Sequence, residues 1–411
     1  MGCTGKCHIS NVDELVNSDA FARARVSTPY TIFDSKQIVN NSLFFDDQEF
    51  SGGGTTSAWS ANRASTTMGV TALTAGKRVR QTFQRFNYQP GKSQLFIETF
   101  VMGDTESGVV KEVGLFDDKN GLFLRNDGGA ISFVIRNYVT GVADDAVIPQ
   151  ASWNQDVLDG SGNSRITLDI TKAQIFFVDF EWLGVGTVRF GFFFNGKPVY
   201  AHYANHANSI SSVYISTPNL PLRYSIEGDG TAVADDTFEH ICSTVISEGS
   251  LELTGIVRSI DRGITPLTTL STTSIYPLLS ARLKTNHEGI TTIINELQVF
   301  TTANVNYRWV LLLNPTVAGV DAAVWVALAN SAIEYDITRT TANTLTGGLV
   351  LAAGYAAATN QSNNNVEYNV ASAIKPGISI AGVKDQIVLA VQNLANGTNP
   401  YYGELSFREL L

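Results

Sequence analysis

The stretch FEWLGVGTVRFGFFFNGKPVYAHYANHAN, residues 180–208, is centred on the dipeptide Asn195–Gly196. An Asn-Gly pair between alternating apolar residues is the strongest short-range signal for a β-hairpin, because both residues tolerate the positive φ angles of a tight turn. Before the turn, phenylalanine recurs at every second position and so lies on one face of a strand, at Phe190, Phe192 and Phe194. Burying one such side chain contributes about 1.5–3 kcal/mol. The stretch therefore predicts a hairpin whose aromatic face is packed inside a sandwich.

The period-2 pattern extends in both directions from this hairpin. Residues 111–139 contain three strand-like segments, KEVGLF, LFLR and AISFVIRNYV, joined by turns in which Asn120–Gly121 and Asp127–Gly128 would supply positive φ angles. Residues 173–182, AQIFFVDFEW, place apolar side chains on both faces, as an inner strand does. Further strand-like segments follow between residues 276 and 410, and no helical segments alternate with them. The fold class is therefore predicted to be all-β.

The predicted architecture is two antiparallel β-sandwich domains behind a short N-terminal arm. A chain of 411 residues is too long for one ordinary core, and strand signals thin out around residues 243–255. We expect an arm over residues 1–30, a concanavalin- or lectin-like sandwich over 31–245 and a jelly-roll-like sandwich over 246–411. The arm is predicted to carry a short helix within residues 11–27, with acids early and arginines late, as the helix dipole favours.

The composition limits the partners. A net charge of −10 argues against binding to nucleic acid, and no apolar run is long enough to span a membrane. Charged residues make up 16% of the chain, below the ~25% typical of globular domains. Residues 301–411 hold only 12 of them. Because buried interfaces are poor in charge, we expect residues 246–411 to form a homo-oligomer, with a trimer as the working assumption.

The cysteines and histidines predict neither a disulfide framework nor a metal site. Three cysteines, Cys3, Cys7 and Cys242, fit a protein assembled in a reducing cytoplasm. Cys3 and Cys7 stand in CTGKCH without a second pair of ligands, so the role of this segment stays open. His202 and His206, if they shared a strand, would lie ~13 Å apart, too far for one zinc ion. No cofactor is expected.

One acid pair could in principle carry catalysis. Asp179 and Glu181 would share one strand face with their backbones ~6–7 Å apart, whereas retaining glycosidases hold two carboxyl groups ~5–5.5 Å apart. Sandwich glycosidases of the concanavalin-like type often carry three acids spaced as E-x-D-x-x-E. Here Phe177 and Trp182 stand where that pattern has its two glutamates. We therefore expect no catalytic residues and no enzyme.

Six residues are instead candidates for carbohydrate binding. Tryptophan and tyrosine rings stack on sugars, and amides and carboxylates hydrogen-bond their hydroxyl groups. The candidates are therefore loop residues of the first sandwich together with the two strand acids: Trp153, Asn154, Asp179, Glu181, Tyr203 and Asn205. The basic run GKRVRQTFQR, residues 76–85, alternates in the same way as the strands. Its Arg78 and Arg80 are expected on a solvated strand face, with a local anion site as the alternative.

Several longer stretches resemble an uncharacterised family of virion structural proteins from tailed phages and other large double-stranded-DNA viruses. In the first half these are RQTFQRFNYQPGKSQ, VGLFDDKNGLFL, PQASWNQDVLDGSG, ITLDITKAQIFFVDFEWLGVGTVRFGFFFNG and TPNLPLRYSIE. In the second half they are YRWVLLLNPTVAG and SAIEYDITR. The resemblance covers most of residues 30–411, whereas the N-terminal MGCTGKCHIS has no counterpart in it.

The resemblance implies a non-enzymatic, multi-copy component of the particle, on the capsid surface as a decoration, vertex or fibre protein, or in the tail. It would be assembled in the host cytoplasm and would contact itself and other virion proteins such as capsid or tail proteins. An alternative is a receptor-recognition protein of the particle that binds host surface glycans. A third is a glycosidase or depolymerase that uses Asp179 and Glu181.

Overall fold

The computed structural model describes residues 18–21, 23–25, 28–39, 41, 43–103, 105–269, 271–357, 363–367 and 375–410. Within these ranges the chain is all-β, as predicted: the strands are antiparallel and the one helical element is a 3-10 turn at Gln150–Ser152. None of the described helical residues forms a segment that could cross a membrane. The chain divides into two compact units, Met1–Thr82 with Phe86–Glu252, and Phe83–Arg85 with Leu253–Leu411.

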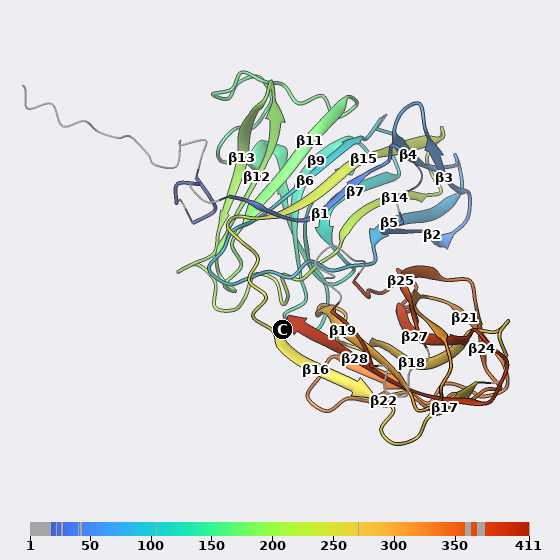
Figure 1. Ribbon diagram of the computed structural model, residues 1–411. Coiled ribbons are helices and arrows are strands. Elements are labelled where there is room, and N and C mark those ends of the chain that lie inside the picture. The colour runs from blue at the N-terminus through green and yellow to red at the C-terminus, as the bar shows by residue number, and fades with distance from the viewer. Residues whose placement is uncertain are drawn as a thin grey trace, which may run out of the picture. The chain divides into compact units, whose positions relative to one another are not determined.

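Unit 1 consists of two antiparallel sheets that enclose a common core (Figure 1). The first sheet has eight strands, in the order β13 (Lys197–Asn205), β12 (Thr187–Phe194), β11 (Ala173–Phe180), β6 (Gln94–Val101), β15 (Asp236–Ser247), β4 (Ser65–Val70) and β3 (Thr55–Ser60), with β1 (Tyr30–Lys36) also paired to β15. The second sheet has seven, in the order β10 (Asp144–Pro149), β9 (Ala130–Asn137), β8 (Gly121–Asp127), β7 (Val109–Phe116), β14 (Leu222–Asp229), β5 (Ala75–Thr82) and β2 (Phe45–Gly52).

The hairpin predicted around Asn195–Gly196 joins β12 to β13 at one edge of the first sheet (Figure 1). Asn195 and Gly196 have φ angles of 51° and 75°, which is the pair of positive values that a type I′ turn needs. The alternate phenylalanines face the core as expected. Phe190 and Phe192 have no exposed surface, and the ring of Phe190 stacks at 4.6 Å on Phe133 of the second sheet.

The meander predicted over residues 111–139 is also present, as β7, β8 and β9, and it continues into β10. The turn chemistry differs from the prediction at one of its two turns. Neither Asn120 nor Gly121 has a positive φ angle. The turn is held instead by the Asp117 carboxylate, which accepts hydrogen bonds from the backbone N–H groups of Lys119 and Asn120, each at 2.8 Å. An aspartate side chain can close a turn in this way without left-handed residues.

The helix predicted within residues 11–27 is not found in the part of that range that the structure describes. Residues 11–17 lie outside the described ranges. Ser18 and Ala24 instead form an antiparallel bridge, and the Asp19 carboxylate accepts hydrogen bonds from the N–H groups of Phe21 and Arg23. Asp19 also pairs with the Arg23 side chain at 2.7 Å. These local bonds compete with helix formation, and the thin apolar stripe of this segment provides little to oppose them.

Unit 2 also has two sheets around a shared core. The five-stranded sheet runs β16 (Ile256–Asp261), β28 (Asn399–Leu410), β19 (Thr291–Thr301) and β26 (Asn363–Glu367), with β17 (Leu267–Thr269) paired to β28. The six-stranded sheet runs β22 (Val326–Ala327), β23 (Ile333–Asp336), β18 (Tyr276–Leu283), β27 (Gln386–Asn393), β20 (Tyr307–Leu313) and β25 (Leu349–Ala356), and a separate pair joins β21 (Thr316–Ala318) to β24 (Thr344–Thr346). The jelly-roll-like connectivity stays a prediction.

Candidate functional site

Asp179 lies at the centre of a polar cluster on the outer face of the first sheet. Its neighbours on β11, Val178 and Phe180, point into the core, so the Asp179 side chain points away from it. The carboxylate has no exposed surface. Arg25 and Arg189 each donate from Nη2 to Oδ2 at 2.5 Å, and the Ser93 hydroxyl donates to Oδ1 at 2.5 Å. Asp179 is therefore an ionic bridge between the N-terminal segment and the sheet.

Arg189 is the partner that holds this bridge on the sheet side. It stands opposite Asp179 on β12, and its guanidinium lies 5.0 Å from the centre of the Tyr200 ring. It also donates to the backbone oxygen of Ser18 at 3.1 Å. Burial lowers the pKa of Arg189, but the Asp179 carboxylate and the neighbouring tyrosines outweigh this, so the pKa is raised overall. Arg189 therefore keeps its charge and holds Ser18 against the sheet.

Glu181, the second acid of the predicted pair, bonds the backbone at the start of β12. Its Oε1 accepts a hydrogen bond from the Thr187 backbone N–H at 3.1 Å. Burial raises the pKa of Glu181, and the bond from Thr187 offsets part of that rise. The two positions where a concanavalin-like glycosidase carries glutamates hold packed aromatics: Phe177 is buried against Tyr200, and the Trp182 indole donates to a backbone oxygen at 3.0 Å.

Trp153 belongs to the core. Its ring is buried and stacks on Phe133 at 4.1 Å with an interplanar angle of 13°, and its indole N–H donates to the Ile148 backbone oxygen at 3.2 Å. A sugar would need an exposed ring face for stacking, and Trp153 offers none. The sequence placed this residue on a loop, but the loop folds its ring inward to fill the space beside Phe133.

Asn154 closes the free edge of β13. Its side-chain NH₂ donates to the Tyr203 backbone oxygen at 2.8 Å, and its side-chain oxygen accepts from the Tyr203 backbone N–H at 2.9 Å. The next backbone N–H groups, of Gln155 and Asp156, donate to the Ala201 oxygen at 3.0 and 3.2 Å. The carboxamide of Asn154 thus replaces the neighbouring strand that an edge strand lacks. The hydrogen bonds of the Asn154 side chain are thus used to cap the edge strand.

Tyr203 and Asn205 lie beside one another at the end of β13, on the face that carries Asp179. The Tyr203 ring is half-buried against Tyr200, and the exposed Asn205 side chain accepts a hydrogen bond from the Thr187 hydroxyl at 3.1 Å. Of the six predicted carbohydrate candidates, the structure brings Asp179, Tyr203 and Asn205 to one region of this face. Only Tyr203, Asn154 and Asn205 of the six combine surface exposure with a ring or an amide.

The two histidines of HYANH lie in different surroundings. The His206 ring stacks on Tyr214 at 4.3 Å, and its Nδ1 bonds the Gly186 backbone oxygen at 2.7 Å. His202 lies on β13, where burial lowers its pKa. No group of three or more histidine, cysteine, aspartate or glutamate side chains within the described ranges could hold a metal ion. Cys3 and Cys7 lie outside those ranges.

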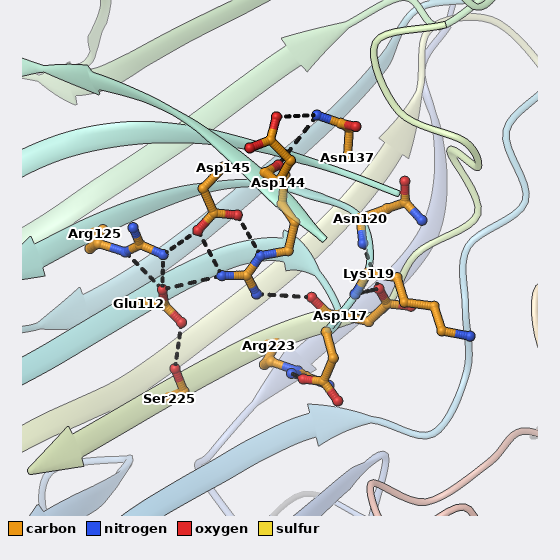
Figure 2. A network of polar contacts seen from close by, with 12 residues as sticks. Glu112, Asp117, Lys119, Asn120, Arg125, Asn137, Asp144, Asp145, Arg223 and Ser225 are labelled. Carbon is orange, nitrogen blue, oxygen red and sulfur yellow. Dashed lines mark hydrogen bonds and ion pairs between the residues drawn. The ribbon is translucent and has the colours of Figure 1, made fainter. Parts of the chain in front are cut away.

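A second polar network, which the sequence did not predict, covers the outer face of the second sheet (Figure 2). Glu112 accepts from Arg125 at 2.9 Å and from Ser225 at 3.1 Å, and Asp145 accepts from Arg125 at 2.6 Å and from Arg136 at 2.7 Å. Burial raises the pKa of Asp145, but the bonds from Arg136 and Arg125 prevail and lower it overall. The arginines of the network are paired with its acids, so their positive charge is already neutralised and does not form a binding site for an anion.

This network lies over a pair of aromatic rings. Phe116 and Phe123 stack at 4.4 Å on the same outer face. The guanidinium of Arg136 lies 5.0 Å from the centre of the Phe123 ring, and that of Arg223 lies 5.4 Å from the centre of the Phe116 ring. The arginines therefore shield apolar surface from water as well as pairing with acids. A signal for this was present in the sequence, since acids and arginines alternate with apolar residues on the neighbouring strands of the meander.

Arg80 overturns the expectation of a solvated strand face for the basic run. It is fully buried and points into unit 1, where it donates to His240 Nδ1 at 3.0 Å, Asp47 at 3.0 Å and the Gln37 side-chain oxygen at 3.2 Å. Burial lowers the pKa of His240 far below its usual value, and the Arg80 charge adds to this. Burial likewise raises the pKa of nearby Glu98 well above its usual value. Arg80 is therefore part of the interior, whereas Lys77 and Arg78 stay partly exposed. The alternation of the run alone could not reveal the partners of Arg80.

Comparisons with known proteins leave the family open. No family model and no curated protein matches the chain. Among solved structures, the Emp47p carbohydrate recognition domain is 8% identical, with 54% of this chain and 97% of that chain covered and a TM-score of 0.33. A CBM2 module from the evolved Dit of Lactobacillus casei BL23 phage J-1 is 10% identical, with coverages of 55% and 98% and a TM-score of 0.34. A Bacteroides ovatus GH16 protein in complex with a glucan product is 7% identical, with 52% and 99% covered and a TM-score of 0.35. These likenesses assign neither a ligand nor a reaction to the chain.

Proposed function

We propose that this chain is a non-enzymatic structural protein of a virus particle, present in many copies on the capsid surface or in the tail. The observation that best supports a non-enzymatic role is the complete burial of the Asp179 carboxylate. A catalytic carboxyl group must reach the substrate, whereas Asp179 is enclosed by Arg25, Arg189 and Ser93 and has no exposed surface. The placement in a virion is supported by the resemblance of several long stretches to virion structural proteins.

Unit 2 supports an assembly role within this proposal. It is poor in charge, and it exposes large apolar side chains on several strands and loops; those with at least half of their surface exposed are Val257, Ile264, Val320, Val324, Val350, Tyr355 and Val383. Unit 1 exposes as many such side chains, so the feature that favours unit 2 as the interface is its low charge, which is typical of buried interfaces. We propose that unit 2 is a jelly-roll-like oligomerisation domain, that the oligomer is a trimer, and that capsid or tail proteins of the virion cover the rest.

The test is the composition of intact particles from the virus that encodes this chain. Particles assembled in the host cytoplasm and purified through two density gradients should contain the chain in a fixed, multi-copy ratio to the major capsid protein, measured by quantitative mass spectrometry. Immunogold labelling should place it at the particle surface or the tail. Its absence from intact particles, with abundance in the host lysate, would contradict the proposal.

A second candidate function is binding of host surface glycans. It is favoured by Asn154, Tyr203 and Asn205, which lie close together at the edge of the first sheet and combine a half-buried tyrosine ring with two exposed amides. A glycan array probed with the purified chain tests it. Signals that disappear in Tyr203→Ala and persist in Tyr138→Ala, a change just beyond the end of β9, would support this function. An array without signal would contradict it. The glycosidase alternative finds no support in the enclosed Asp179.

A further inference from the structure

Lys111 and Asp236 face one another across the interior of unit 1. Lys111 lies on β7 of the second sheet, opposite the core residue Ile226, and Asp236 lies on β15 of the first sheet, opposite the core residue Val70. Each side chain is only 1% exposed, and Nζ lies 2.6 Å from Oδ1. This ion pair therefore connects the two sheets at a point that water does not reach.

The hydrogen bonds of the pair are unequal. Oδ1 of Asp236 accepts from Lys111 and from the Thr237 backbone N–H, the latter at 2.7 Å. Oδ2 is buried and accepts no hydrogen bond from the described residues. Lys111 also donates to the backbone oxygen of Met102. A buried carboxylate with one unpaired oxygen is costly in free energy, and a buried ion pair recovers its desolvation cost only when its remaining atoms are bonded well.

We propose that Lys111 and Asp236 condense spontaneously into an intramolecular isopeptide bond. The ammonium group passes one proton to the carboxylate, which leaves a neutral amine beside a neutral carboxyl group. Nζ then attacks Cγ of Asp236, the Cγ–Oδ2 bond breaks, and Oδ2 leaves as water with the two protons released by Nζ. The products are one secondary amide and one water molecule, so no oxidant, reductant or cofactor is needed.

The surroundings favour each part of this step. A dry interior disfavours the two charges and so favours the neutral amine and acid. The two groups are held in contact by opposite sheets, which replaces a bimolecular encounter by an intramolecular one. The atom expelled is the unpaired Oδ2. The amide that forms keeps the bonded atoms: its oxygen is Oδ1, which accepts from Thr237, and its remaining N–H can continue to donate to Met102.

The cross-link would join residues 125 positions apart in the chain and would tie the two sheets together. Closing a loop of this length restricts the unfolded chain strongly. The bond would therefore make unit 1 resistant to heat, denaturant and protease. This inference goes beyond the proposed function and does not depend on it, since it rests on the Lys111–Asp236 geometry alone.

The test is the mass of the purified full-length chain. Intact-mass spectrometry under denaturing conditions should give the mass of the sequence less one water molecule. Tryptic digestion should leave Lys111 uncleaved and yield a branched peptide whose fragments link Lys111 to Asp236. A folded chain of full mass with linear peptides carrying free Lys111 and Asp236 would overturn the proposal. A loss of water that fragmentation places at any other residue would overturn it as well.

Three comparisons make the test specific. Lys111→Met should restore the full mass, because methionine fills the same space without an amine. Asp236→Asn should form the same amide with loss of ammonia in place of water, and so should have the same final mass as the native chain. This second variant keeps the proposal testable even if Lys111→Met fails to fold. Lys384 and Glu334, paired at 2.9 Å but 13% and 17% exposed, serve as the matched pair in the same digest and should stay unlinked.

Discussion

Asp179 and Arg189 stand opposite one another on β11 and β12 and are joined by a 2.5 Å ion pair whose carboxylate has no exposed surface. The pair lies in the same strand region that, by sequence alone, could have been an acid-lined cleft. Arg25 completes the arrangement from the N-terminal side at 2.5 Å. On this face of the first sheet, ion pairs therefore hold the N-terminal segment against β11 and β12. The opposite face of the sheet packs into the core through phenylalanine side chains.

Removing the Asp179 charge should destabilise unit 1. Asp179→Asn leaves Arg189 buried without its counter-charge, whereas Arg25, 23% exposed, keeps Glu248 at 3.4 Å. Breaking a buried ion pair in this way costs about 3–5 kcal/mol. Urea denaturation followed by tryptophan fluorescence measures the change. Glu181→Gln, at a group that is only partly buried, is the matched control and should change the free energy of unfolding by less than about 1 kcal/mol. Equal stability of Asp179→Asn and the native chain would contradict this account.

Truncating phenylalanines on the two faces of β12 should cost different amounts of stability, because only one face is packed in the core. Phe190→Ala removes a fully buried ring that stacks on Phe133, so we expect a loss of about 3–5 kcal/mol. Phe193→Ala, on the other face of the same strand and half-buried, should cost only about 1–2 kcal/mol. The midpoint of chemical denaturation checks both variants. A larger loss for Phe193→Ala than for Phe190→Ala would mean that the wrong face has been assigned to the core.

Asn154 should protect the edge of β13 against self-association. In Asn154→Ala the Tyr203 N–H and C=O groups lose their partners, so the strand can pair with a second copy. Light scattering coupled to size-exclusion chromatography should then detect concentration-dependent larger species. Gln155→Ala, which removes only a weak exposed side-chain bond of 3.3 Å, should behave as the native chain does. Identical elution of all three proteins would argue against this role.

The stability of unit 1 should depend on pH through Glu98. Burial raises its folded pKa well above 4.5, and the nearby Tyr224 hydroxyl offsets only part of that rise. The neutral acid is therefore the form that the fold accommodates. The contribution of Glu98 to stability is fully present below pH 4.5 and is lost as the pH rises through the folded pKa.

Glu98→Gln removes that titration. The variant should gain stability relative to the native chain between pH 4.5 and pH 7, while the two proteins should differ little below pH 4.5. Free energies of unfolding measured across this range check the prediction. His240 acts in the opposite direction: its folded pKa lies well below 6.5, so its contribution is lost as the pH falls below 6.5, equally in both proteins. A difference between the proteins that stays constant with pH would contradict the assignment.

The sequence predicted what local periodicity controls and missed what distant residues supply. The β12–β13 hairpin and the faces of Phe190 and Phe192 follow from an Asn-Gly turn and a period of two, both of which are local. Arg80 was placed in solvent because its partners Asp47 and His240 are 33 and 160 residues away. Trp153 was placed on a sugar-facing loop because the fold of the loop after β10, which lays the Trp153 ring on Phe133 of β9, leaves no local pattern in the sequence.

Hydrogen exchange across residues 173–205 tests the central claim most directly, namely that this region is a rigid scaffold and not a binding or catalytic cleft. Amide protons in strands of a packed core exchange only when the whole unit unfolds. The account predicts that β11 and β12 exchange with the same free energy as the global unfolding of unit 1, measured by denaturant. Exchange of these strands through a local opening of much lower free energy, with protection restored by an added polysaccharide, would contradict it.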